Sequence, residues 1–181
     1  MPVFVALLKG VNVGQAKRIP MAAFRALLAS LGYLDVRTLL NSGNAIFRGA
    51  DVPQARHAAA IHDALVATLG LDVQVVVKSS RDWHAIVREN TLAADSDDPS
   101  RLLVVFAQSH AAIDALRPLE RGTPPERFVV GRHAAYLRCP DGVLSGQVGS
   151  ALLGKAGRDV TTRNWTTVGK LTALLAEVED R

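Results

Sequence analysis

Cysteine is almost absent from this chain of 181 residues, which contains only Cys139. A single thiol excludes a disulfide within the chain, so nothing in the sequence points to an oxidising compartment. Residues 1–8 lack the basic start of a secretory signal, and no apolar run approaches the roughly 20 residues that a membrane helix needs. We therefore expect a cytoplasmic protein that has no membrane partner.

Signatures of metal sites and of catalysis are also missing. The five histidines are scattered, and neither HExxH nor a paired Cys/His spacing occurs. The acidic run at residues 95–98 lacks the glycine and the terminal glutamate of a calcium loop. Spacing assembles no nucleophile, base and orienting acid, although it does not exclude a triad formed in space. We expect no metal and no cofactor, and the sequence indicates no catalytic residue.

Acidic residues are scarce in the first quarter of the chain. The net charge is +4 overall, and the first 48 residues contain six Lys or Arg against one acid, Asp35. This bias favours an anionic partner, and a solubility charge on an Arg-rich protein explains it equally well. Aromatic residues make up only 5% of the chain, and the RRM motif with its stacking aromatics is missing. Nucleic acid is therefore a weakly supported partner.

The hydrophobic pattern predicts two similar halves. In the first half, apolar runs predict strands at residues 3–8, 36–40, 45–48 and 73–78. One helix follows Pro20 and another follows Pro53. The order strand, helix, strand, strand, helix, strand is typical of a ferredoxin-like unit. In such a unit the loop at residues 9–19 and the turn at residues 41–44 leave the sheet at the same end, so we expect them to be neighbours.

The second half repeats this order. We expect strands at residues 102–106, 128–130, 135–138 and 160–162, and helical segments at 112–119 and 150–155. A final helix carries an apolar face that begins at Trp165. The fold class is thus α+β, with two ferredoxin-like (βαββαβ) subdomains and an extra C-terminal helix. The expected boundaries are 1–79 for the first subdomain, 80–100 for a connector whose short helix Ser80 caps, and 101–181 for the rest.

Three segments carry a resemblance to a known family: residues 8–21 (LKGVNVGQAKRIPM), 41–47 (NSGNAIF) and 161–171 (TTRNWTTVGKL). Their order and spacing resemble the bacterial family known as domain of unknown function 1697, over nearly the whole chain. The resemblance implies two ferredoxin-like subdomains and supplies no reaction. Two positions depart from the family pattern. Gln15 replaces a second glycine, and Gly146 stands after Ser145 where the family often has a lysine.

The loop at residues 9–18 is the first candidate site. Its glycines free the backbone to aim N–H groups at an anion, and the helix after Pro20 adds a positive dipole end. Neither a Walker A loop nor GxGxxG is present, and the glycines are also explained by turn geometry alone. The basic side chains of the loop can neutralise a phosphate or a carboxylate. The predicted ligand contacts of this loop are Lys9, Asn12, Gly14, Lys17 and Arg18.

Two further segments complete the predicted site. The turn at residues 41–44 offers polar groups next to the first loop, although ordinary hairpin chemistry explains its composition. The fork of Arg163 fits a carboxylate or phosphate, and pairing with Asp159 is the alternative. Thr162 or Asn164 can cap the last helix. The predicted ligand contacts in these segments are Ser42, Asn44, Arg163 and Asn164.

The sequence therefore favours an uncharacterised protein that binds an anionic, phosphate- or carboxylate-bearing ligand at a polar site shared by its two halves. Three alternatives stay open at this point. The chain can be a small-molecule enzyme that acts on a phosphorylated substrate, or a nucleic-acid-binding module. In the third, the motif residues have only a structural role.

Overall fold

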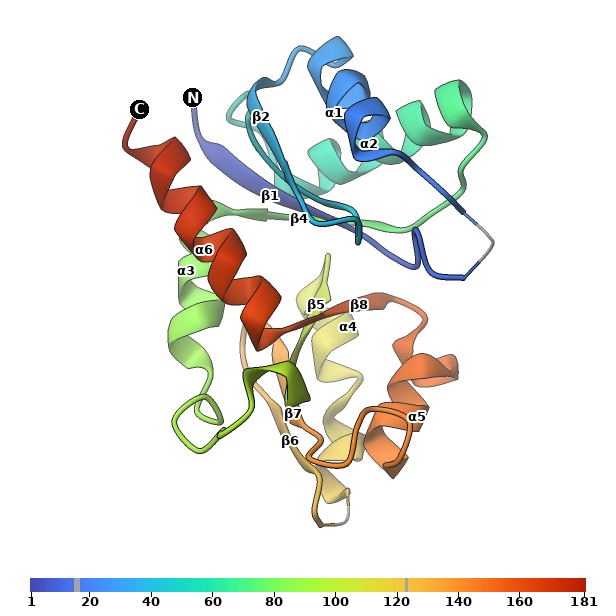
Figure 1. Ribbon diagram of the computed structural model, residues 1–181, viewed down its shortest axis with the longest axis vertical. Coiled ribbons are helices and arrows are strands. Elements are labelled where there is room, and N and C mark those ends of the chain that lie inside the picture. The colour runs from blue at the N-terminus through green and yellow to red at the C-terminus, as the bar shows by residue number, and fades with distance from the viewer. Residues whose placement is uncertain (15–16, 123) are drawn as a thin grey trace. The chain divides into compact units, whose positions relative to one another are not determined.

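The computed structural model describes residues 1–14, 17–122 and 124–181, which form two compact units. One unit comprises Met1–Trp83 and Leu171–Arg181, and the other comprises His84–Lys170. Within the described residues each unit contains one four-stranded antiparallel sheet, and the chain forms six α-helices (Figure 1). The protein is therefore mixed α+β, as the hydrophobic pattern predicts.

The sheet of the first unit has the strand order β2-β3-β1-β4. Its strands are β1 (Val3–Leu8), β2 (Leu34–Leu39), β3 (Asn44–Arg48) and β4 (Val75–Ser79). Strand β1 lies between β3 and β4, and all six of its residues are buried. Both faces of the central strand are thus covered, which explains why its sequence is an unbroken apolar run.

Helices α1 (Met21–Ser30) and α2 (Gln54–Leu69) lie over one face of this sheet (Figure 1). A proline stands directly before each helix. Gly70 ends α2 with φ of 62°, in the left-handed conformation that glycine adopts without steric cost. Phe24 and Leu65 pack from the two helices into the apolar core against the sheet. This packing holds the start of α1 at one end of the sheet.

The second unit has the same element order on a sheet with the strand order β6-β7-β5-β8. Its strands are β5 (Leu102–Ala107), β6 (Arg127–Val130), β7 (Ala135–Arg138) and β8 (Val160–Asn164). Helix α4 (His110–Asp114) contributes Ile113 to the core of this unit, and α5 (Gln147–Leu153) contributes Val148 and Leu152.

Two predicted helical segments have bounds that differ from those expected. Instead of a helix over residues 112–119, α4 ends at Asp114 and a 3-10 turn covers Arg117–Arg121. Pro118 explains the break, because its nitrogen cannot donate the next helical hydrogen bond. Helix α5 ends at Leu153, and a separate 3-10 turn covers Lys155–Gly157. None of the described helices combines the length and the apolar character needed to cross a membrane.

Helices α3 (Ser80–Glu89) and α6 (Trp165–Glu179) contain the boundaries between the two units. Within the first unit, Trp83 Nε1 donates a hydrogen bond of 2.9 Å to Thr172 Oγ1 and so joins α3 to α6. At the start of α3, Asp82 N donates a hydrogen bond of 3.2 Å to the hydroxyl of Ser79. The cap is therefore Ser79 instead of the predicted Ser80. The predicted division into residues 1–79, 80–100 and 101–181 stays a prediction.

Candidate functional site

The loop after β1 and the β2–β3 turn are neighbours, as the predicted topology requires. Leu8 N donates to Gly43 O at 2.8 Å, and Asn12 Nδ2 donates to Asn41 O at 2.6 Å. Gly43 has a φ of 76°, and a Cβ atom there would lie 2.7 Å from carbons of Leu8 and Val11. The turn therefore packs directly on the loop, and only glycine fits at this point.

Asn12 holds the two ends of the loop together. Its Nδ2 donates to Ile19 O, and its Oδ1 accepts from Ile19 N, both at 2.9 Å. Its backbone N donates to Lys17 O at 3.1 Å, and its φ of 56° is in the left-handed region that asparagine tolerates. Because the second Nδ2 hydrogen reaches Asn41 O, both amide hydrogens are already used within the protein.

Asn44 has a comparable role in the hairpin. The residue is fully buried, and its Nδ2 donates to Leu39 O and to Ser42 Oγ, both at 2.9 Å. A buried amide needs such partners, because an unpaired polar group loses its hydration without compensation. Asn44 and Ser42 thus fix the shape of the turn that faces the loop.

A cavity of about 310 Å³ lies where the loop enters α1. Its lining residues are Asn12, Arg18, Ile19, Pro20 and Asn41. The first backbone N–H groups of a helix have no partner within the helix, and Pro20 contributes no side-chain cap to α1. The cavity therefore combines a positive helix terminus with the guanidinium of Arg18, and none of its five lining residues is acidic.

The three basic side chains of the loop differ in their surroundings. Arg18 Nη2 donates to Gly14 O at 3.0 Å, and Lys17 Nζ donates to Asp72 O at 3.1 Å. Lys9 is half-buried, and its backbone N donates to Gln74 O at 3.0 Å. Of the predicted loop contacts, Asn12 and Arg18 therefore line the cavity. The substitution at Gln15 lies outside the described residues.

The late motif lies in the second unit. Arg163 is 8% exposed, and its Nη1 donates to Thr161 Oγ1 at 3.0 Å and to Thr162 O at 2.7 Å. Burial lowers the pKa of this guanidinium to about 10, because desolvation disfavours the charged form. Asn164 Oδ1 accepts from Thr167 N at 2.9 Å, which confirms Asn164 as a cap of α6. Ligand contact by Arg163 or Asn164 stays a prediction.

The model of a family described as "Protein of unknown function (DUF1697)" matches residues 1–136 of the chain. The chain belongs to the DUF1697 family. The match contains the loop and the turn of the first unit and ends before the segment at residues 161–171. No protein with a curated description matches the chain.

This DUF1697 chain is also similar to a solved structure, that of the conserved bacterial protein SP0830 from Streptococcus pneumoniae. The TM-score is 0.80 at 22% sequence identity, over 96% of this chain and 98% of the other. At this level of identity the likeness shows the fold alone.

Gly146, which departs from the expected family pattern, leaves room for an acid in this DUF1697 protein. A Cβ atom at this position would lie 2.0 Å from the Glu126 carboxylate. That carboxylate accepts from Val148 N at 2.9 Å and from Gly149 N at 3.1 Å, at the start of α5. No side chain therefore fits at residue 146 unless Glu126 moves.

One buried lysine was not predicted from the sequence. Lys78 is 7% exposed and pairs with Val5, the third residue of β1. Arg163 is paired with Val104, the third residue of β5, so the two sheets carry a buried cation at the same register position. Burial lowers the pKa of Lys78, an effect that the charge of Asp82 partly offsets. The ammonium has no hydrogen-bond or ion-pair partner in the described part of the chain.

One signal for Lys78 exists in the sequence. The lysine follows a run of valines in β4 and lies two residues after Val76, which is fully buried. Alternation along a strand places both side chains on one face of the sheet. Among the described residues, no group of three or more His, Cys, Asp or Glu side chains is placed to hold a metal ion.

Proposed function

We propose that this protein binds an anionic ligand, bearing a phosphate or a carboxylate, in the cavity at the start of α1. The observation that carries the proposal is that Arg18 and the uncapped N-terminus of α1 meet at one cavity of about 310 Å³. Backbone N–H groups and the helix dipole favour an anion at a helix N-terminus. A guanidinium adds a planar pair of donors that matches a carboxylate or a phosphate.

The proposal assigns different roles to the predicted site residues. Arg18 contacts the ligand, and Lys17 and Lys9 add positive charge around the loop. Asn12, Asn44 and Ser42 position the loop and the turn, because their polar groups are engaged within the protein. Gly14 has a φ of 64°, and its carbonyl oxygen accepts a hydrogen bond from Arg18 Nη2. This hydrogen bond orients the guanidinium.

We also propose that each unit is a ferredoxin-like βαββαβ subdomain and that α6 is the added helix. The strand orders β2-β3-β1-β4 and β6-β7-β5-β8 support this proposal. In this arrangement the first βα loop and the β2–β3 turn share one end of the sheet, where the cavity lies.

Isothermal titration calorimetry with inorganic phosphate and with succinate tests the binding proposal. We expect saturable binding of at least one of the two anions by the native protein. The R18Q variant should bind about 10-fold more weakly or worse, because it loses a charge-assisted hydrogen bond. R25Q is the matched control, since Arg25 is an exposed residue of α1 that donates to Thr38 Oγ1 outside the cavity. Equal weakening by R18Q and R25Q, or no binding of either anion, would overturn the proposal.

A purely structural role for the motif is the second candidate. The observation that favours it is that both Nδ2 hydrogens of Asn12 and the Nδ2 group of Asn44 are used within the protein. On this hypothesis, substitutions at Asn12 lower the stability of the protein, whereas R18Q does not change the binding of phosphate or succinate. The calorimetry described above therefore separates the two candidates.

A further inference from the structure

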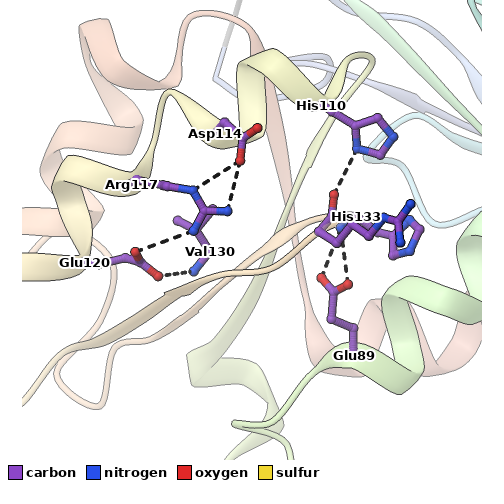
Figure 2. Close-up of polar contacts among 8 residues, drawn as sticks. Glu89, His110, Asp114, Arg117, Glu120, Val130 and His133 are labelled. Atoms are coloured by element: carbon purple, nitrogen blue, oxygen red, sulfur yellow. Dashed lines mark hydrogen bonds and ion pairs between the residues drawn. The ribbon is translucent and has the colours of Figure 1, made fainter.

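Lys78 in β4 is a buried cation without a partner. It is 7% exposed, and its ammonium makes no hydrogen bond or ion pair with any residue that the structure describes. Charged groups of the second unit are held differently, as Figure 2 shows. Arg117 Nη2 donates to Asp114 Oδ1 at 3.0 Å, and Glu89 Oε1 accepts from His133 N at 3.1 Å. Because a charge that is buried without such partners destabilises the fold, stability does not explain this lysine.

The side chains next to Lys78 on the sheet are apolar. Val75 and Val77 of the same strand belong to the core under α1 and α2, so Lys78 and Val76 lie on the opposite face of the sheet. Val5, which is paired with Lys78 on β1, and Val76 are both fully buried. Such surroundings favour the neutral form of an amine, because they offer no counter-charge to an ammonium.

One acid acts on Lys78 without forming an ion pair with it. Burial lowers the pKa of the Lys78 amine, and the charge of Asp82 offsets this effect only in part. The Asp82 carboxylate instead accepts a hydrogen bond from Gln54 Nε2. At neutral pH the uncharged fraction of Lys78 is therefore larger than that of an exposed lysine. The lone pair of an uncharged amine makes it a nucleophile.

The amine of Lys78 is not closed off from solvent. Among the described residues, the unpaired side-chain atoms that solvent does not reach are Gln74 Oε1 and Asn90 Nδ2. Lys78 Nζ is unpaired and is not one of them. In addition, β4 lies at one edge of the strand order β2-β3-β1-β4, so no further strand of this sheet flanks Lys78 on the outer side. A small molecule can therefore reach the nitrogen.

We propose that Lys78 is the nucleophile of a site for a small, uncharged aldehyde, with which it forms an imine. The lone pair of the uncharged Nζ forms a bond to the carbonyl carbon, and the carbonyl oxygen leaves as water with the two Nζ hydrogens. The step consumes no oxidant or reductant. The imine is uncharged, so its formation removes the unpaired charge from an apolar environment. The site belongs to the first unit and does not depend on anion binding at α1.

Reductive trapping with propanal and sodium cyanoborohydride tests this proposal. Cyanoborohydride adds hydride to the imine carbon, so each lysine that forms an imine keeps a propyl group. Peptide mass spectrometry can follow every lysine of the chain, which are Lys9, Lys17, Lys78, Lys155 and Lys170. At about pH 7 we expect Lys78 to be modified about 10-fold faster than Lys170, an exposed residue of α6. In urea the two rates should become equal.

Two comparisons decide whether the reaction belongs to this site. K78M should lose the product at residue 78 and keep the rates at the other lysines. Glyoxylate is an anionic aldehyde, so the preference for Lys78 over Lys170 should be smaller with glyoxylate than with propanal. The proposal is overturned if Lys78 of the folded protein reacts with propanal no faster than Lys170. An equal preference with the two aldehydes would overturn the assignment of an uncharged ligand.

Discussion

Asn12 is the residue on which the geometry of the α1 site depends most. Its side chain makes three hydrogen bonds, two with Ile19 and one with Asn41 O. Glycine at this position keeps the left-handed backbone and removes only the side chain. We predict that N12G lowers the free energy of unfolding by about 2–3 kcal/mol, as expected for the loss of several net hydrogen bonds.

Urea unfolding followed by circular dichroism measures this change. N41A is the matched control, because Asn12 is bonded to the backbone carbonyl of Asn41 and the Asn41 side chain is exposed. We expect N41A to cost less than about 0.5 kcal/mol. If N12G is as stable as N41A, the amide of Asn12 does not hold the loop.

Lys78 gives a prediction with a defined pH dependence. Burial lowers the pKa of its ammonium below the ordinary 10.5, so the unfolded chain holds this proton more tightly than the folded chain. Stability should therefore rise with pH until the unfolded value near 10.5 is passed. We predict that K78M stabilises the protein at neutral pH by about 1 kcal/mol, because it removes an unpaired buried charge.

Urea unfolding of the native protein and of K78M, at neutral and at alkaline pH, checks this prediction. The difference between the two proteins should shrink as the pH rises. K170M is the control, since Lys170 is an exposed residue of α6. A constant difference between the native protein and K78M over this range would show that the buried ammonium does not titrate differently on folding.

At the scale of elements, the close approach of the β2–β3 turn to the loop is set by Gly43. Alanine at this position adds a Cβ atom 2.7 Å from carbons of Leu8 and Val11, in addition to the cost of a φ of 76°. We predict that G43A destabilises the first unit by about 3 kcal/mol. The measurement is again urea unfolding.

G10A separates the steric effect from the backbone effect. Gly10 has a φ of 66°, and nothing lies within 4 Å of an added Cβ atom. This variant should therefore cost only about 1 kcal/mol. Equal losses in G43A and G10A would mean that the turn does not pack on the loop as the structure places it.

The sequence predicted most elements because their signals are local. The apolar run of β1 and the proline before α1 depend on a few neighbouring residues. The nearness of residues 9–19 and 41–44 followed from element order alone, and the hydrogen bond from Asn12 to Asn41 O confirms it. The predicted helix over 112–119 was wrong, because the missing N–H of Pro118 ends the helix at Asp114 despite the apolar helical pattern.

At the scale of the whole molecule, burial could not be predicted, because it depends on residues that are distant in sequence. Lys78 and Arg163 are ordinary basic residues in the sequence, yet both are buried in the structure. A cavity of about 450 Å³ in the second unit, which His110 and Arg132 help to line, was also not predicted. His110 and Arg132 are 22 positions apart, and only the folded hairpin brings the imidazole to the Arg132 carbonyl.

The central claim is that an anion binds at the start of α1. The most direct measurement is the backbone amide spectrum of isotope-labelled protein during titration with inorganic phosphate or succinate. We predict saturable shifts of the backbone amide signals of Met21, Ala22 and Ala23. The affinity from these shifts should equal the affinity from calorimetry, and the shifts should be lost in R18Q. If the amide signals of these three residues respond to neither anion, the claim is contradicted, whatever the other amides do.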